Sequence, residues 1–439
     1  MENIPLLNEI WTDFSEAFTG LIPLFKIVFD IFTAWWWLVI PFILIPEVKR
    51  HWLFWKAVSR DDKSILLEVF IPQNMEKPIR AMENVIVGFW PLYGIPGWYD
   101  KWWKGKTEAG FSLEIISIDG NPRFLVRCPA DDRALFESSI YAEYPEAEIF
   151  EVEDYTQKVP SDIPNERWDL WGTDFTMNAD VYPIKTYREF ETEKEIKEEK
   201  RIDPMANLVE GLNRIEKGEQ IWIIISATPV ADSEIGFFKK ADKEINKIAG
   251  RKEKPKGLGF FADVLNTLTG FPPKPEAKED DSLPEMKLTS GEKEKIKAIE
   301  AKKSKHLYDC FVRFVYVAKK ENFSGSRVKL PIGYINQFNG QNKLTPWKET
   351  ITKISQGWYN WFWFIERRLY VRKRKIFRNY LRRVPAFFPK SKKGQTFILN
   401  SEELASLYHF PSKYSSPYSS ISRVEAKKKE PPANLPVED

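Results

Sequence analysis

The strongest constraint on the fold is an Asp-Gly pair placed between two alternating apolar runs. Residues 111–118 (FSLEIISI) and 121–128 (NPRFLVRC) flank Asp119 and Gly120. Both central residues of a tight hairpin turn need a positive φ, which Gly adopts freely and Asp tolerates. The sequence therefore predicts an antiparallel hairpin over residues 111–128.

Further elements flank this hairpin in a regular order. Residues 64–72 predict a strand, and residues 76–89 predict a helix because their apolar side chains recur at helical spacing. After the hairpin, Asp131 or Asp132 is expected to cap a second helix, and a last strand follows that helix. The order strand, helix, strand, strand, helix, strand is typical of ferredoxin-like domains, so we expect such a domain over residues 64–155.

Composition limits the classes of site and partner. The 439 residues carry 66 Lys and Arg against 63 Asp and Glu, a net charge of +3, so any binding of polyanions must come from local clusters. Three histidines supply little for metal or triad chemistry. Cys128 and Cys310 lie far apart in predicted strands, which argues against a disulfide or zinc site and favours buried thiols in a reducing compartment.

The chain begins with an acidic stretch followed by an apolar one. Residues 1–20 contain no Lys or Arg, so they lack the basic start of a cleaved signal peptide, and we expect an external tail. Residues 21–46 are almost wholly apolar and predict a single transmembrane helix; an interfacial helix and a buried soluble helix remain alternatives. The expected anchor residues are Ile31, Trp35, Trp36, Trp37, Leu38 and Phe42.

The residues after this stretch predict its orientation. The juxtamembrane segment 47–63 contains Lys49, Arg50, Lys56 and Arg60. Positive residues near a membrane helix stay on the cytoplasmic side. We therefore expect a single-pass protein of the cell's inner (cytoplasmic) membrane, with the N-terminus outside and the body in the cytoplasm.

Residues 166–410 predict a second α+β domain, so the whole chain is of the α+β class. Residues 168–175, 220–229 and 306–319 have the β-branched and aromatic character of strands. An insertion at about 237–305 interrupts them, and its centre combines Pro with mixed charge and few apolar residues, so we expect it to be mobile. The tail 411–439 is expected to be extended.

A basic, aromatic helix is expected at about 350–384. Apolar residues from Trp358 to Tyr380 fall close to one helical face, while cations crowd the rest. Such a helix suits an anionic membrane surface or a nucleic-acid backbone; a helix that packs on the body and solvates a basic face is the alternative. The candidate contact residues are Arg367, Arg368, Arg372, Lys373, Arg374, Lys375, Arg378, Arg382 and Arg383.

The sequence contains no complete motif of the common catalytic, metal-binding or cofactor-binding kinds. Gly105, Lys106 and Thr107 match the end of a nucleotide-binding loop, but Asp100 stands where its first Gly belongs. No H-E-x-x-H, C-x-x-C or G-x-S-x-G occurs. We expect no enzyme activity, no cofactor and no metal. An acidic strand offers a docking surface for a partner instead, through Glu146, Glu148, Glu151, Glu153 and Asp154.

Several segments together resemble a known family. They are QNMEKPIRAME (residues 73–83), SLEIISIDGNPRFLVR (112–127), IYAEYPEAEIFEVEDY (140–155), FILNSEELASLYHFP (397–411) and PPANLPV (431–437). In combination they resemble the N-terminal, membrane-anchored portion of type IV secretion and conjugation ATPases, related to coupling proteins of the FtsK/HerA motor class. In that family the last segment precedes the motor domain, whereas this sequence stops at Asp439. The resemblance implies an anchor and adaptor without the ATPase.

The expected function follows from the anchor and this resemblance. The chain is predicted to be a non-catalytic platform of a type IV secretion or conjugation-like DNA translocation machine, recruiting a separately encoded P-loop ATPase through protein-protein interaction. Motors of this class form rings, so the resemblance also implies a homo-oligomer. Two alternatives stay open: a membrane-surface or DNA-binding protein acting through residues 367–383, and a purely structural membrane scaffold.

Overall fold

The chain divides into two compact units, which are described separately. One contains Met1–Asp62 and Pro96–Thr107, and the other contains Lys63–Ile95 and Glu108–Asp439. The computed structural model describes residues 23–31, 33–35, 37, 40–42, 44–49, 51–52, 64–72, 77–100, 108–191, 203–250, 288–353, 364–387 and 394–411.

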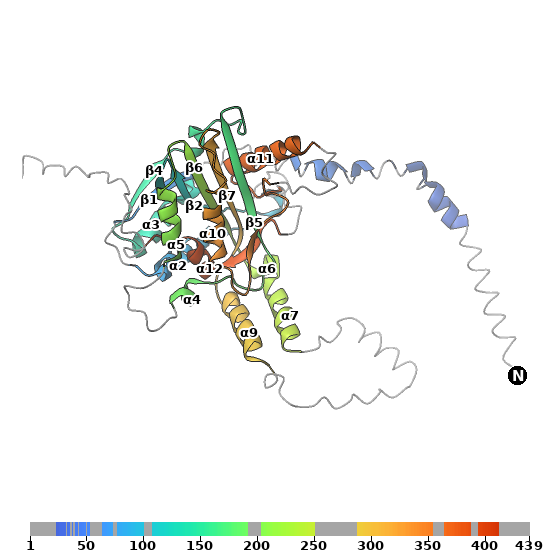
Figure 1. The fold of residues 1–439 in the computed structure, drawn as a ribbon. Coiled ribbons are helices and arrows are strands. Elements are labelled where there is room, and N and C mark those ends of the chain that lie inside the picture. The colour runs from blue at the N-terminus through green and yellow to red at the C-terminus, as the bar shows by residue number, and fades with distance from the viewer. Residues whose placement is uncertain are drawn as a thin grey trace, which may run out of the picture. The chain divides into compact units, whose positions relative to one another are not determined.

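The second unit is built on a nine-stranded sheet in the order β4-β1-β3-β2-β6-β7-β5-β8, with β9 paired to β7 (Figure 1). Each of these strand pairs is antiparallel. The strands are β1 (Ser64–Phe70), β2 (Phe111–Ile118), β3 (Asn121–Pro129), β4 (Glu148–Val152), β5 (Trp168–Met177), β6 (Glu219–Val230), β7 (Leu307–Lys319), β8 (Leu344–Pro346) and β9 (Phe397–Asn400). The α+β class is therefore confirmed.

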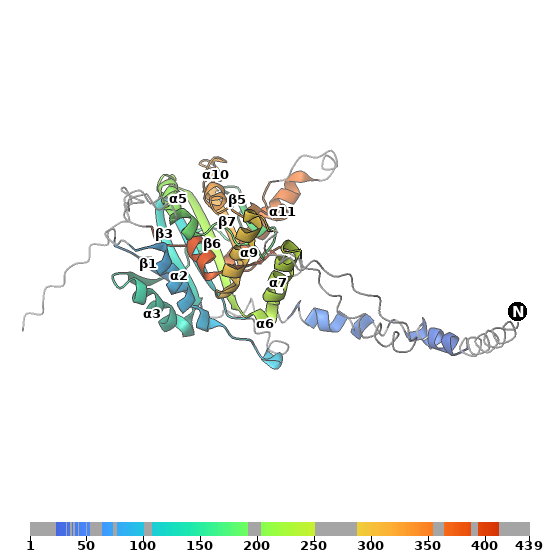
Figure 2. The same cartoon turned by 90° about the horizontal axis from the view of Figure 1, so that it is seen from below.

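Helices cover both faces of this sheet. Helices α2, α3, α5, α10 and α12 share one hydrophobic core with one face, across which Figure 2 shows α2, α3 and α5, whereas α11 packs on the other face. The helices are α2 (Ile79–Gly88), α3 (Arg133–Glu143), α4 (Tyr187–Glu191), α5 (Pro204–Asn213), α6 (Asp232–Ile235), α7 (Phe237–Ile248), α9 (Ser290–Lys303), α10 (Lys329–Asn336), α11 (Ile365–Leu381) and α12 (Ser401–Leu407), with short 3-10 turns η1 (Trp90–Leu92), η3 (Ala130–Asp132) and η4 (Tyr155–Lys158).

The predicted hairpin is confirmed as β2 and β3. Asp119 and Gly120 have φ values of 54° and 83°, as the tight turn requires. The Asp119 carboxylate also accepts a hydrogen bond of 2.6 Å from the backbone N–H of Gly218, which ties the turn to the loop before β6. The expected cap of the next helix is wrong: Asp132 stands at the N-cap of α3, but its side chain makes no capping hydrogen bond.

The strand order repeats within the sheet. The first half runs β1-α2-β2-β3-α3-β4 along the chain and is arranged β4-β1-β3-β2, and the second runs β5-α5-β6-β7-α10-β8 and is arranged β8-β5-β7-β6. The two orders are the same when each half is numbered from its own first strand. Antiparallel pairing of β2 with β6 joins the halves, from Phe111 opposite Ala227 to Ile118 opposite Gln220. The segments expected as separate domains thus share one sheet.

Period-2 alternation along the strands separates the two cores. In β6, Ile221, Ile223 and Ile225 face the core formed with α2, α5, α10 and α12. Trp222 and Ile224 face the other core, which contains residues of α11. Successive strand side chains point to opposite faces, so a central strand buried on both sides carries an almost continuous apolar run. This explains why QIWIIISA forms a strand rather than a helix.

The insertion lies in the hairpin between β6 and β7. Its helices α7 and α9 lie side by side at one end of the sheet (Figures 1 and 2), and a small core that includes Phe237 and Ile299 joins them to the strands. Thr289 and Glu292 form the capping box that starts α9. Residues 251–287, where mobility was expected, lie outside the described residues.

The C-terminal strand and helix also form as the sequence predicts. Asn400 caps α12 and exchanges side-chain and backbone hydrogen bonds with Glu403. Strand β9 pairs with the start of β7, and the whole of α12 is buried. These contacts place the C-terminal part of the described chain in the core that the sheet forms with α2, α5 and α10.

In the first unit, no described helix is by itself long and apolar enough to cross a membrane, and the helical segments Pro23–Trp35 and Ile40–Lys49 meet that criterion only together, across a bend of 69°. The expected anchor residues Ile31, Trp35, Trp37 and Phe42 have exposed side chains. Trp36 and Leu38 lie outside the described residues.

Candidate interaction site on helix α11

The described helix within the expected basic segment is α11, which is shorter than the predicted 350–384. Residues 350–353 are not helical, and Trp358 and Phe362 lie outside the described residues. The inward face of α11 carries Ile376, Phe377 and Tyr380, all buried. The rings of Phe377 and Tyr380 lie 6.4 and 5.3 Å from the Trp222 ring of β6. This apolar face holds α11 on the sheet.

The predicted cationic cluster divides into two sets with different surroundings. Members of the first set bind groups of the protein itself. The Lys373 ammonium lies 2.6 and 2.8 Å from the two carboxylate oxygens of Asp169, and the Arg372 guanidinium donates to the Ile351 carbonyl at 3.3 Å. The Arg383 side chain is only 5% exposed. These three cations are therefore held by the protein fold.

The second set faces outward. Arg367, Arg368, Lys375, Arg378 and Arg382 are exposed and Arg374 is half-buried. The Lys375 ammonium lies 3.9 Å from the centre of the Phe387 ring.

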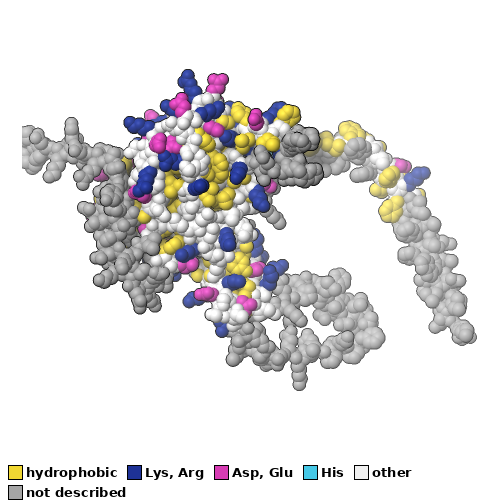
Figure 3. All heavy atoms as spheres, viewed as in Figure 1, with side chains coloured by type: hydrophobic (Ala, Val, Ile, Leu, Met, Phe, Trp, Pro, Cys, Tyr) yellow, Lys and Arg dark blue, Asp and Glu magenta, His cyan; other side chains and the backbone are white. Residues whose placement is uncertain are grey.

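Apolar side chains lie among these outward cations. Phe364, Tyr370 and Val371 are also exposed, and Figure 3 shows hydrophobic and basic side chains together at the position of α11. Arg367, Val371 and Arg378 share one stripe, because residues four and eleven apart in a helix point in nearly the same direction. The outward surface is both cationic and apolar.

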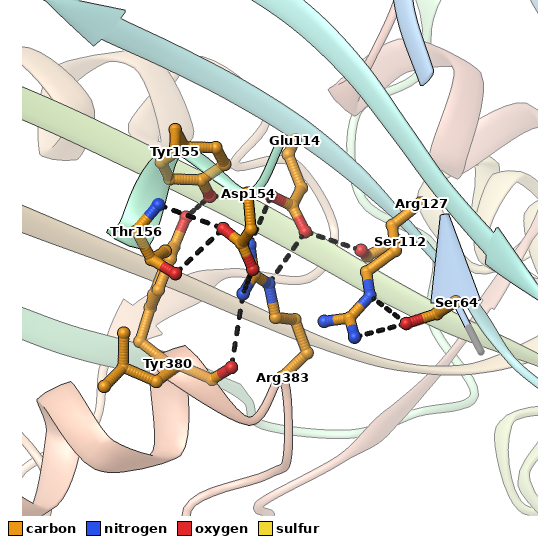
Figure 4. A network of polar contacts seen from close by, with 10 residues as sticks. Ser64, Ser112, Glu114, Arg127, Asp154, Tyr155, Thr156, Tyr380 and Arg383 are labelled. Carbon is orange, nitrogen blue, oxygen red and sulfur yellow. Dashed lines mark hydrogen bonds and ion pairs between the residues drawn. The ribbon is translucent and has the colours of Figure 1, made fainter. Parts of the chain in front are cut away.

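A buried polar network fixes the end of α11 to the sheet (Figure 4). Arg383 directs two guanidinium nitrogens at the Asp154 carboxylate, at 2.6 and 3.0 Å, and its Nε donates to Glu114 of β2 at 3.2 Å. Paired hydrogen bonds of this kind fix geometry as well as charge. Arg313 of β7 adds a second link, because it donates to the Val384 carbonyl at 3.0 Å.

Hydroxyl groups complete the surroundings of Glu114. The Tyr155 hydroxyl donates to Glu114 at 2.6 Å and lies 2.6 Å from the Tyr380 hydroxyl of α11. Ser112 donates to the other Glu114 oxygen at 2.8 Å. Burial raises the pKa of both tyrosines well above the ordinary value, so they stay neutral and keep their protons for donation. Both oxygens of the buried Glu114 carboxyl group therefore accept a hydrogen bond.

Arg383 and Asp154 stabilise each other in this network, whereas the charge of Arg383 disfavours that of Arg127. Burial alone would raise the pKa of Asp154, but the hydrogen bonds and charge of Arg383 outweigh it and hold the pKa below its ordinary value. Burial, then the neighbouring charge of Arg383, lowers the pKa of Arg127, which donates to Ser64 at 2.9 Å. The network thus favours the charged form of Asp154. We call its core the polar clamp, which consists of Glu114, Asp154, Tyr155, Tyr380 and Arg383.

The predicted acidic docking residues occupy two different settings. Strand β4 is an edge of the sheet, and Glu146, Glu148, Glu151 and Glu153 are exposed along it or beside it. Glu151 accepts a bond of 2.6 Å from Arg133 of α3. Asp154, by contrast, points inward to Arg383 and accepts from the Thr156 backbone, so its role in the described structure is in the clamp.

Other buried ion pairs tie the C-terminal helix to the body. The buried pair Lys302 and Glu403 joins α9 to α12 at 3.1 Å, and Lys305 lies between Glu83 of α2 and Glu402 of α12. Among the residues that the structure describes, no group of His, Cys, Asp or Glu is placed to hold a metal ion. Cys128 and Cys310 are free and buried, as predicted.

Sequence reasoning missed the core of the clamp. Glu114 and Tyr155 were not singled out, and Tyr380 was predicted only as part of the apolar face of the helix. One signal was present: Glu114 is the one charged residue of a mostly apolar strand, and a buried carboxylate requires a partner. No local pattern identifies Arg383 as that partner, because the two residues lie 269 positions apart.

Comparison with known proteins places the chain in a family. No curated protein matches it. Residues 100–419 match a family described as a domain of unknown function (DUF8128), and this region includes β2 to β9 and α11. Because the match covers well over half of the 439 residues, the chain belongs to the DUF8128 family.

Proposed function

We propose that the protein is a non-catalytic, membrane-associated platform whose helix α11 rests on an anionic lipid surface. The observation that carries this proposal is the division of the α11 cations. Arg372, Lys373 and Arg383 hold the helix in place, while a cationic outward face also exposes Phe364 and Val371. A bilayer surface offers anionic headgroups and an apolar layer below them, so it can satisfy both kinds of side chain.

The N-terminal segment supports the same proposal. Large apolar side chains in residues 23–49, among them Phe25, Phe29 and Phe42, are exposed. Exposing so many large apolar side chains to water is unfavourable, at roughly 25 cal/mol per Å², and exposed apolar surface of this kind marks protein or membrane contacts. We propose that residues 21–46 anchor the chain in the membrane, with the body on the cytoplasmic side.

For the body, we propose two fused ferredoxin-like units. The support is the shared strand order of the halves, β4-β1-β3-β2 and β8-β5-β7-β6, each with two helices on the same sheet face. The paired strands β2 and β6 make them one continuous sheet. A surface built on such a sheet keeps its geometry when a partner binds, which suits a platform.

The proposed partner is a P-loop translocation ATPase of the type IV secretion and conjugation class. Its support is the resemblance of residues 112–127, 140–155 and 397–411 to the adaptor portion of such proteins. The exposed carboxylates Glu146, Glu148, Glu151 and Glu153 give the edge strand β4 a charge suited to a basic docking surface.

Co-purification and flotation test this proposal together. A tagged full-length chain, extracted in mild detergent from its own cells, should carry a P-loop ATPase, and Glu146→Lys with Glu148→Lys should release that ATPase. The same chain should float with vesicles containing anionic lipid and float less with purely zwitterionic vesicles. A chain that floats with neither vesicle, or that brings down no ATPase under conditions that preserve known complexes, would refute the corresponding part of the proposal.

A further inference from the structure

An exposed aromatic pair lies in the short helical segment that begins at Trp98, between η1 and β2. Trp98 is 70% exposed and the adjacent Tyr99 is 60% exposed. Both lie within Pro96–Thr107, the segment that belongs to the same compact unit as Met1–Asp62. Neither residue belongs to α11 or to the polar clamp, so neither of those two features accounts for the exposure of the pair.

The chemistry of the pair indicates its surroundings. Trp and Tyr combine a large apolar ring with a polar N–H or O–H, and they are enriched where hydrocarbon meets lipid headgroups. A soluble protein normally covers aromatic rings of this size in its interior. The sequence that follows, KWWKGK over residues 101–106, has the same mixture of Trp and Lys. Lys side chains extend their ammonium groups toward anionic headgroups when their stems lie on apolar surface.

The position in the fold favours lipid over a protein partner. The exposed apolar residues of the proposed anchor, including Phe29 and Phe42, lie in the same compact unit as Trp98. A second exposed apolar element in the unit that carries the anchor is thus tethered where a bilayer would be. Tethering raises the local concentration of lipid around Trp98 and Tyr99, so even a modest affinity for lipid is sufficient.

We propose that Trp98 and Tyr99 insert into the headgroup region of the membrane as an interfacial anchor. This inference rests on the proposed membrane association of the chain and adds a contact outside both residues 21–46 and α11. Insertion of one Trp ring removes enough apolar surface from water for Trp98→Ser to weaken vesicle binding about tenfold, whereas Trp98→Phe retains most of it.

A fluorescent label beside the pair tests the insertion directly. Gly97 has no atom within 4 Å of an added Cβ, so Gly97→Cys provides an attachment site that leaves Trp98 in place. Gly333 of α10 is equally open and lies on the sheet face opposite α11, so Gly333→Cys is the matched control. The native Cys128 and Cys310 are buried and burial raises the pKa of each thiol, so an environment-sensitive label reacts at the introduced cysteine.

The full-length labelled chains are floated with vesicles that carry a quencher on the lipid. The emission of the label at 97 should shift to the blue and be quenched, and the label at 333 should do neither. If the chain floats but the label at 97 is not quenched, the inference is overturned and the proposed function stands. Binding of Trp98 to a protein instead of lipid would give this result. Failure of the wild-type chain to float would overturn both the inference and the proposed function.

Discussion

Arg383 lies directly after the last turn of α11, and its two terminal guanidinium nitrogens donate hydrogen bonds of 2.6 and 3.0 Å to the Asp154 carboxylate. The backbone of Arg383 has a φ of 50°, a left-handed conformation that costs a non-Gly residue roughly 1 kcal/mol or more. The strain is offset by a buried cation that meets Glu114 as well as Asp154. This relationship fixes which side of α11 faces the sheet and which side faces outward.

Removing the cation should destabilise the fold. Arg383→Ala leaves Glu114 buried without its positive partner, and we expect a loss of about 3 kcal/mol in the free energy of unfolding. Urea denaturation of the wild-type and variant proteins measures this loss. The double variant with Asp154→Asn should lose less than the sum of the single losses, because the two residues interact. A loss below about 0.5 kcal/mol for Arg383→Ala would show that the clamp does not matter for stability.

The same pair predicts a dependence on acid. The pKa of Asp154 lies below its ordinary value of 3.8 in the folded chain, so its contribution to stability is full above about pH 4 and is lost as the pH falls through the lower folded value. In Asp154→Asn that part of the pH dependence should be absent. The measurement is the free energy of unfolding between pH 2 and pH 7; equal slopes for the two proteins below pH 4 would contradict the assignment.

The hairpin turn should tolerate no side chain at its second position. Gly120 has a φ of 83°, and an added Cβ would lie 3.0 Å from the carbonyl oxygens of Asn213 and Ile215. Gly120→Ala is expected to cost about 1–3 kcal/mol. Gly333→Ala in α10 is the control, since open space and a helical position should make it stabilising by about 0.5–1 kcal/mol. Equal effects of the two substitutions on the melting temperature would argue against this account of the turn.

Both thiols should be inert in the folded chain. Burial raises the pKa of the Cys128 thiol to about 12, and Cys310 is completely buried. A water-soluble disulfide reagent at pH 8 should react with neither thiol in native protein and with both in urea. Rapid reaction of a native thiol would instead reveal local opening of β3 or β7.

The elements of the fold were largely predictable because their signals are local. The Asp119-Gly120 turn, the capping boxes at Thr289 and Asn400, and the long apolar strand at β6 each depend on a few neighbouring residues. The joining of the halves was not predictable, because the β2–β6 pairing brings together Phe111 and Ala227 from distant parts of the chain. The sequence of a buried strand does not show whether the strand pairs within its own domain or with a strand of another domain.

The candidate site was predicted only in outline. Helical spacing identified an apolar face that includes Ile376 and Tyr380, and it identified the surrounding cations. Which cations turn inward depends on carboxylates from other elements, Asp169 for Lys373 and Asp154 for Arg383, and no helical pattern contains that information. The structure therefore changes which substitutions test the surface: Arg372 and Lys373 report on the fold, and Arg367 and Arg378 report on binding.

Vesicle flotation with these two sets of residues tests the central claim most directly. Arg367→Gln with Arg378→Gln removes exposed charge from one stripe of α11, and at about 1 kcal/mol per cation near an anionic surface it should weaken binding about thirtyfold without changing stability. Lys373→Gln, which breaks the pair with Asp169, should lower stability but leave vesicle binding unchanged. Unchanged binding by the Arg367 and Arg378 variant, at a salt concentration where the wild-type chain floats, would contradict the claim that α11 faces a lipid surface.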